Sequence, residues 1–364
     1  MSINHIYDTW FPWLKQLWPD GSLPQIRNAA WFMTGLYESH SVQLHQIARK
    51  ILSPATLPSR IRRLARFLQN PRWPVRPSYA PVAQFLIQHL VATLGEIRLI
   101  ADGSRVAFHH QLLLIAIAFR GRAVPLCWTW IPSARGHSSA RQQLALLAYV
   151  HDLIPSGTPV SFVGDAEFGA VEVQQQLDAW TWQFVVRQKA NNQVRRTPHD
   201  PWQDFGSLVQ QAGQSVWWPQ ARLTAKHDYA VNLLAYWQAG EQEPWLLATN
   251  EPTPTDTRRA YRRRMWIEEL FGDLKGHGFD LGSTHLRHLT RLSRLILLVV
   301  LLYVWLLLAG VRTIQRGERH CVDRRDRRDL SVFQIGWRFI DWLLSQGVPL
   351  PKALKPMSLL KVLC

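Results

Sequence analysis

The sequence has little cysteine and no recognisable export signal. Its three cysteines, Cys127, Cys321 and Cys364, are odd in number and far apart, which excludes a disulfide framework and the close pairs of a zinc site. The N-terminus lacks the basic segment and apolar run of a secretory signal peptide. A reducing compartment, the cytoplasm and its nucleoid, is therefore expected.

Acidic residues are also in the minority. The chain has 26 Asp and Glu against 42 Lys and Arg, a formal net charge of +16 over 364 residues. This excess indicates a polyanionic partner, nucleic acid or an acidic membrane surface, although it says nothing about the fold. A hydrophobic content of 47% excludes a disordered chain. The 18 Trp residues fit base stacking and a Trp-rich core equally well.

Long apolar runs are rare, and a single uncharged one stands out. It covers Leu295–Val311, is at the short limit for crossing a bilayer, and has basic residues on both sides. The hypothesis of a membrane-anchored basic protein is supported by this run alone. A fully buried helix has the same hydropathy, and we favour that interpretation.

The N-terminal part, residues 1–95, has apolar residues at helical spacing in four segments separated by Pro- and Ser-containing breaks. We expect a helical domain that binds DNA, because arginines cluster in it and acids are few. A solvated basic face is the alternative. The arginines are Arg60, Arg62, Arg63, Arg66, Arg72 and Arg76.

The pattern changes at residue 96 to strand, strand, strand, helix, strand, helix, strand, and this α/β pattern continues to residue 190. Two of its apolar strands, Ile97–Ala101 and Pro159–Gly164, run directly into Asp102 and Asp165. Residues 191–250 are rich in Gln and Trp with short alternating runs, which predicts a β-rich insertion. Residues 251–312 return to helix, and residues 313–364 form a helical and basic C-terminal tail.

A basic helix over Thr257–Lys275, with Asp256 as its N-cap, is the most informative segment. Tyr261, Arg264, Glu268 and Lys275 fall on one face of it. A solvated charged face would give the same pattern.

Asp102 and Asp165 favour a chemical role for this face. A lone Asp after a strand is commonly a turn former or N-cap. Two of them together with Glu268 can form a three-carboxylate cluster, which suits hard divalent cations such as Mg²⁺. Two such ions can activate a nucleophile and stabilise the leaving oxygen of a phosphodiester. Arg264 and Lys275 suit the neighbouring phosphates. The adjacent Glu269 lies off the helix face that carries Tyr261, Arg264, Glu268 and Lys275.

The sequence resembles the IS4-type DDE transposases. Tyr261-x2-Arg264-x3-Glu268-x6-Lys275 matches their YREK motif at every spacing. The two Asp motifs correspond to Ile100-Ala101-Asp102-Gly103-Ser104 and Val163-Gly164-Asp165-Ala166-Glu167-Phe168-Gly169. Trp245–Asn250 is similar to the last strand of the β insertion in these enzymes. The resemblance covers residues 96 to 310.

The resemblance implies an α/β fold, in which an RNase H-like mixed-sheet catalytic core (96–190 and 251–312) is interrupted by the β-rich insertion. Asp102, Asp165 and Glu268 would be the catalytic and metal-binding acids, holding two Mg²⁺ ions, with Mn²⁺ as an alternative. Tyr261, Arg264 and Lys275 would contact DNA. A Trp of the insertion often stabilises a flipped base in this family. Four tryptophans qualify, and none is assigned: Trp202, Trp217, Trp218 and Trp237.

The expected function is that of a transposase that binds the terminal inverted repeats of an insertion sequence, then cuts the DNA and joins it to a target. Its partners would be double-stranded DNA, both element ends and target, and a second copy of the chain in the synaptic complex, without a membrane. The alternative is a catalytically inactive, transposase-derived DNA-binding protein. The intact acids and intact YREK spacing argue against it.

Overall fold

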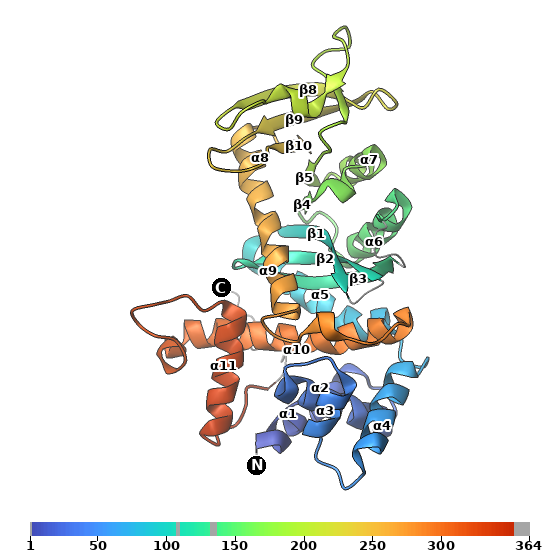
Figure 1. Ribbon diagram of the computed structural model, residues 1–364, viewed down its shortest axis with the longest axis vertical. Coiled ribbons are helices and arrows are strands. Elements are labelled where there is room, and N and C mark those ends of the chain that lie inside the picture. The colour runs from blue at the N-terminus through green and yellow to red at the C-terminus, as the bar shows by residue number, and fades with distance from the viewer. Residues whose placement is uncertain (1, 107–109, 132–136, 353–364) are drawn as a thin grey trace. The chain divides into compact units, whose positions relative to one another are not determined.

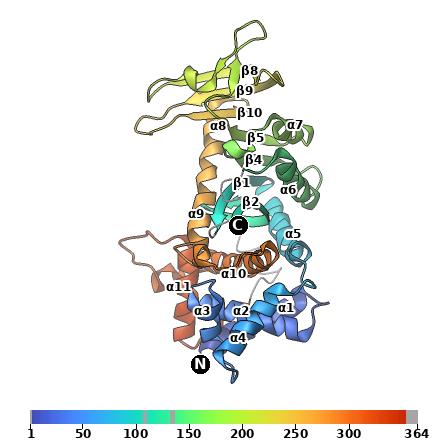
Figure 2. The same cartoon turned by 45° about the vertical axis from the view of Figure 1, so that its right-hand side comes forward.

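The computed structural model describes residues 2–106, 110–131 and 137–352 (Figures 1 and 2). By their contacts, the residues form two units. The first contains residues 1–93, 105–110 and 271–364, and the second contains residues 94–104 and 111–270. The domain boundaries expected from the sequence are not decided by this division and stay predictions.

The first unit is helical, which confirms the predicted helical N-terminal region. Side chains cap the starts of two of its helices. Before α2, the Ser22 N–H donates to Gln25 Oε1. Before α11, Ser331 and Gln334 form a reciprocal capping box, in which the hydroxyl of Ser331 accepts the Gln334 N–H. Its helices are α1 (Ser2–Leu17), α2 (Leu23–Ser39), α3 (Leu44–Lys50), α4 (Leu57–Gln69), α5 (Val75–Leu94), α10 (Leu289–Gln315) and α11 (Val332–Ser345). The short 3-10 turns η4 (Leu281–Ser283) and η5 (Glu318–Cys321) flank α10.

Helix α10 contains the long apolar run of the sequence. Within the described residues it is the one helix long and apolar enough to cross a membrane, and 94% of its most apolar stretch is buried inside the protein. It packs against α2, α4 and α11. A core helix can have the same length and composition as a membrane span. The burial of α10 therefore favours the interpretation as a core helix.

Two glycines allow α10 and α11 to approach closely. A Cβ atom on Gly310 would collide with the carbonyl oxygen of Val332, and one on Gly336 would collide with that of Leu306. Both obstacles are backbone atoms, which cannot rotate away. The crossing therefore depends on glycine at both positions.

The second unit is built on a ten-stranded mixed sheet with the order β3-β2-β1-β4-β5-β10-β9-β8-β6-β7. Strands β1, β4 and β5 are parallel, and β2 and β3 form an antiparallel hairpin. The strands are β1 (Ile97–Val106), β2 (His110–Phe119), β3 (Arg122–Ile131), β4 (Val160–Gly164), β5 (Gln183–Arg187), β6 (Gln193–Arg195), β7 (Gln203–Asp204), β8 (Ser215–Leu223), β9 (Tyr229–Tyr236) and β10 (Trp245–Thr249).

A tight hairpin turn joins β2 and β3. Phe119 pairs with Arg122, so the loop has two residues, Arg120 and Gly121, with φ of 46° and 77°. Two positive φ angles are characteristic of a type I′ turn, whose twist matches that of the flanking strands.

Helices cover both faces of the sheet. α6 (Ala140–Leu153) and α7 (Val171–Ala179) lie on one face and α8 (Pro254–Tyr261) on the other (Figures 1 and 2). The strands of the 191–250 segment extend the same sheet beyond β5, where β10 pairs with β5 and β9. The predicted class, an RNase H-like mixed sheet with a β-rich insertion and a helical N-terminal region, is confirmed.

Two local predictions were wrong. β1 does not end at Ala101 but continues to Val106, although its pairing with β4 ends at Ala101. The basic helix is also not continuous: α8 is followed by a 3-10 turn, η3 (Arg262–Arg264), and then by α9 (Met265–Leu274). Its N-cap is Thr253 rather than Asp256, because the Thr253 hydroxyl accepts the Asp256 N–H at 3.1 Å.

Candidate active site

Asp102 and Asp165 lie side by side because of the register of two parallel strands. Ala101 pairs with Gly164, and each Asp is the next residue of its chain. Neighbouring strands are about 4.8 Å apart, and side chains two residues apart share a face. Asp165 therefore points to the same face as Val163, which packs against α8. Asp102 occupies the matching position on β1.

Asp102 is only 7% exposed, and its Oδ1 accepts the Gly103 N–H at 2.7 Å. Burial and the nearby charge of Asp165 raise the pKa of Asp102 to about 7, although Arg264 and the Gly103 N–H act in the opposite direction. Asp102 therefore keeps its proton to a higher pH than an ordinary aspartate does.

Asp165 is an N-cap, as a lone Asp after a strand often is. It caps the 3-10 turn η1 (Ala166–Phe168) by accepting the Glu167 N–H at 3.0 Å. Burial raises the pKa of Asp165 above its usual value, even though this hydrogen bond acts in the opposite direction. The cap fixes the carboxylate of Asp165 beside Asp102 through its Oδ1 atom.

Arg264 lies beside two of the acids. Its Nη2 is 3.5 Å from Asp102 Oδ2, and its Nη1 forms an ion pair with Glu268. Burial acts to lower the pKa of Arg264, but the charges of Asp102 and Glu268 outweigh it and the pKa is raised. The structure therefore places this predicted DNA-contacting residue among the carboxylates.

Glu268 and Glu269 have different partners. Glu268 is turned toward Arg264 and Asp102 and keeps a half-exposed side chain. Glu269 instead accepts from Arg122 Nη1 at 2.5 Å, and Arg122 begins β3. Of the two, Glu268 has the position expected of a third acid.

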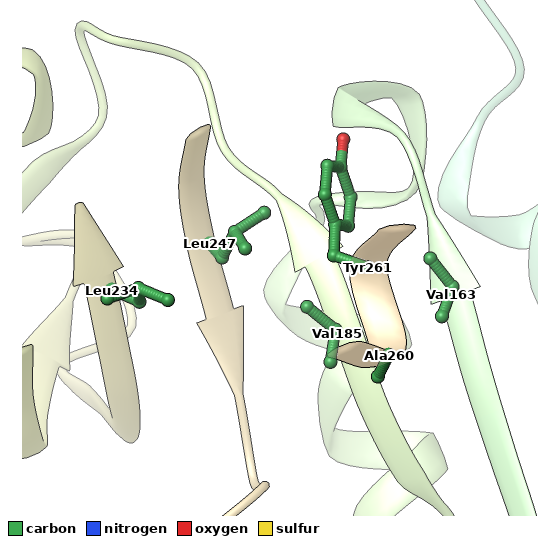
Figure 3. Packing of buried hydrophobic residues seen from close by; sticks show 6 residues of the cluster. All are labelled: Val163, Val185, Leu234, Leu247, Ala260 and Tyr261. Carbon is green, nitrogen blue, oxygen red and sulfur yellow. The ribbon is translucent and has the colours of Figure 1, made fainter. Parts of the chain in front are cut away.

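Tyr261 belongs to the core and is only 4% exposed. Its ring packs with Val163, Val185 and Leu247, and lies 5.1 Å from the ring of Trp245 (Figure 3). Burial raises the pKa of Tyr261 to about 12, so the hydroxyl stays protonated and can donate a hydrogen bond. Figure 3 shows this hydroxyl pointing away from Val185.

Lys275 belongs to the first unit, directly after α9. Its Nζ lies 6.0 Å from the centroid of the Phe271 ring. Burial, together with the charge of Arg105, lowers the pKa of Lys275. Its partial burial beside an aromatic ring differs from the fully solvated lysine of an ordinary charged face.

A hydrogen-bond network around Glu167 holds the Asp165 turn in place. Glu167 Oε1 accepts from the backbone and hydroxyl of Ser138, both at 2.5 Å, and its Oε2 accepts from Gln111 at 3.1 Å. Gln143 of α6 donates to the Glu167 carbonyl at 2.8 Å. A Cβ atom on Gly103 would collide with Gln111. Spacing in the sequence could not reveal Gln111, Ser138 and Gln143, since they come from β2, from the segment before α6 and from α6.

The tryptophans considered for base stacking have different surroundings. Trp217 packs against the cluster that contains Tyr261. The Arg195 guanidinium lies 4.5 Å from the ring centroid of Trp202, and Trp237 donates to the Glu241 carbonyl at 2.9 Å. Trp218 is the neighbour of Trp217 on β8.

A divalent cation fits Asp102 and Asp165 by chemistry. The pair supplies carboxylate oxygens, the ligands that Mg²⁺ prefers, and the raised pKa values show that negative charge there is poorly compensated. Among the described residues no three His, Cys, Asp or Glu side chains are gathered closely enough to hold one ion. Glu268 is instead paired with Arg264.

Comparisons with known proteins identify the family of the chain. Residues 99–305 match the family described as "Transposase DDE domain". Among solved structures, the chain is similar to the piggyBac transposase in a cryo-electron microscopy structure of its synaptic complex with hairpin DNA. The TM-score is 0.45 with 11% identity, over 100% of this chain and 82% of that chain. No curated protein sequence matches. Because the family match covers more than half of the residues, the chain belongs to the transposase DDE domain family.

Proposed function

We propose that this transposase is of the IS4 type, binds the terminal inverted repeats of an insertion sequence, and catalyses metal-dependent DNA cleavage and strand transfer. The observation that carries the proposal is the pairing of Asp102 and Asp165 at the ends of two parallel strands, with Arg264 and Glu268 beside them. The YREK spacing and the family match support it.

The acids would hold the metal. Asp102 and Asp165 supply buried carboxylates with raised pKa values, and Glu268 completes the set once its pairing with Arg264 is exchanged. When bound, two Mg²⁺ ions, or Mn²⁺ in their place, supply Lewis-acid chemistry, activating water and stabilising the leaving oxygen.

The basic and phenolic side chains would position the DNA. Arg264 carries a full positive charge next to the acids and would exchange a carboxylate partner for a phosphate oxygen, which suits the planar guanidinium. Tyr261 stays protonated and can donate to a phosphate. Lys275 supplies a further cation. The partners would be element-end and target DNA, with a homodimer in the synaptic complex, in the cytoplasm at the nucleoid.

A cleavage assay tests the proposal. The full chain is incubated with duplex DNA from the regions flanking its gene, with and without Mg²⁺, and the ends produced are mapped. Cleavage should require the metal and be lost in Asp102→Asn and Asp165→Asn, with DNA binding retained. Binding without cleavage by the unmodified chain under all divalent metals would instead favour the inactive, transposase-derived protein. Metal-independent cleavage would overturn the proposed chemistry.

A further inference from the structure

A basic groove lies between α2 and α4 of the first unit. Its volume is about 580 Å³. Residues from α4 and from the start of α2 line it, and it is named here the α2–α4 groove. The α4 side contributes Ser59, Arg62, Arg63, Arg66, Phe67 and Asn70, and the α2 side contributes Pro24, Gln25 and Asn28.

The arginines of the groove share one face of α4. Arg62, Arg63 and Arg66 follow each other at helical spacing, so they project together. The opposite face of α4 is anchored in the core by Leu64 and Leu68, both fully buried. Three long cationic side chains are thereby exposed on a rigid element.

The positive charge of these arginines is not neutralised by acidic residues of the described chain. The sequence contains no Asp or Glu between Glu38 and Glu96. None of Arg62, Arg63 and Arg66 forms an ion pair with any residue that the structure describes. The same interval contains these Lys and Arg residues: Arg49, Lys50, Arg60, Arg62, Arg63, Arg66, Arg72 and Arg76.

The other basic segment of this unit differs. In the run from Arg324 to Arg328, Arg324 pairs with Asp326 at 2.8 Å and Arg327 pairs with Asp329 at 2.8 Å. Two of the four arginines in this segment are therefore paired with an acid, whereas none of the three groove arginines of α4 is. Of the two segments, α4 is the stronger candidate for binding a polyanion.

The facing wall of the groove supplies neutral hydrogen-bonding groups. Gln25 uses its Oε1 to accept the Ser22 N–H at 3.0 Å, which leaves its amide NH₂ to donate outward. Asn28 lies one helical turn further along α2. Amide donors and guanidinium groups around one groove are what phosphate oxygens require.

We propose that the α2–α4 groove binds the sugar–phosphate backbone of duplex DNA, with Arg62, Arg63 and Arg66 as the phosphate-neutralising residues. The identification of the polyanion as DNA rests on the proposed function. Contacts of this kind fix the register of a protein on the duplex and supply affinity that does not depend on sequence. The groove would thus hold duplex DNA through contacts with its backbone.

The test compares two variants of the full chain with equal loss of charge. One carries Arg62→Gln, Arg63→Gln and Arg66→Gln, and the control carries Arg324→Gln, Arg325→Gln and Arg327→Gln, which include both paired arginines of that segment. Binding of labelled duplexes, one from DNA flanking the gene and one of scrambled sequence, is measured by fluorescence anisotropy in EDTA over a range of salt concentrations. Circular dichroism and thermal melting show whether each variant is folded.

The groove variant should bind both duplexes at least about tenfold more weakly, and its slope of log K against log salt should be shallower by roughly two to three. The control should change little. Unchanged binding by a folded groove variant, or an equal loss in the control, would overturn the proposal. So would a loss confined to the flanking duplex with an unchanged slope.

The result is distinguishable from failure of the proposed function. Because the assay contains EDTA, it does not depend on cleavage, and a chain that binds DNA through the groove but never cuts it would refute only the enzymatic proposal. Absence of DNA binding by the unmodified chain would refute both.

Discussion

Arg264 and Asp102 form the central contact of the candidate site, with Arg264 Nη2 lying 3.5 Å from Asp102 Oδ2. The same guanidinium pairs with Glu268. A single cation thus lies beside two of the three acids expected to bind metal. Positive charges a few ångströms apart repel one another strongly in a poorly solvated site. A divalent ion bound by these acids would therefore compete with Arg264 for the same oxygens.

Replacing Arg264 should change both the acidity of Asp102 and the affinity for metal. In Arg264→Gln, loss of the charge that lowers the pKa of Asp102 should move that pKa above about 7, as followed by carboxyl NMR. At a pH above the pKa of Asp102, Mn²⁺ should bind to Arg264→Gln at least about tenfold more tightly than to the unmodified chain, because the repelling charge is gone. Calorimetry measures this difference. Arg264→Lys keeps the charge and serves as the control. Weaker Mn²⁺ binding by Arg264→Gln would contradict the idea of competition.

The buried Asp102 should make the protein less stable as the pH rises. Its pKa is raised from 3.8 to about 7 on folding, so the folded state binds more protons between these values. The stability that it contributes is complete below about pH 4 and is lost as the pH rises through 7. Asp102→Asn removes this loss and should be more stable than the unmodified chain at pH 8.5, by a few kcal/mol, at about 1.4 kcal/mol per pKa unit.

Urea unfolding at pH 4 and pH 8.5 measures this difference. The gain in Asp102→Asn should shrink or disappear at pH 4. Asp152→Asn, at an exposed carboxylate with 81% side-chain exposure, is the control and should change little at either pH. An equal gain at both pH values would show that Asp102 destabilises the fold for a reason other than its charge.

The sequence allowed the strands and the two acids at their ends to be predicted from local patterns, and the resemblance to a known family added the mixed sheet. The two-residue period of a strand places Val163 and Asp165 on one face, and parallel strands bring Asp102 beside Asp165. The network around Glu167 could not be predicted, since its donors are 24 to 56 residues away along the chain. The 3-10 turn at 262–264 was also missed, because no Pro or Gly marks it.

Glu268 and Glu269 are adjacent and differ in their partners, so they form a matched pair. Glu268→Gln should abolish metal-dependent cleavage, since it removes a carboxylate beside Asp102. Glu269→Gln loses only an ion pair with Arg122 and should cost no more than about 1 kcal/mol of stability, because its side chain is 54% exposed. Cleavage rates and urea unfolding of both variants check this. The opposite pattern would make Glu269 the third acid.

Two substitutions of Tyr261 distinguish the packing of its ring from hydrogen bonding by its hydroxyl. Tyr261→Ala leaves a cavity among Val163, Val185 and Leu247 and should lower the free energy of unfolding by about 3–5 kcal/mol. Tyr261→Phe keeps the ring, so it should stay folded and weaken binding of element-end DNA if the hydroxyl donates to a phosphate. Full DNA affinity in Tyr261→Phe would show that Tyr261 acts in the core alone.

The crossing of α10 and α11 should tolerate no side chain at Gly336. A Cβ atom there would meet the Leu306 carbonyl oxygen and the Gly310 nitrogen, which are both backbone atoms. Gly336→Ala must separate the helices and should cost about 1–3 kcal/mol or more, measured as a lower urea midpoint. Gly282→Ala is the control, because nothing lies within 4 Å of its added Cβ. If both variants unfolded at the same urea concentration, the close approach of the helices would not be a source of stability.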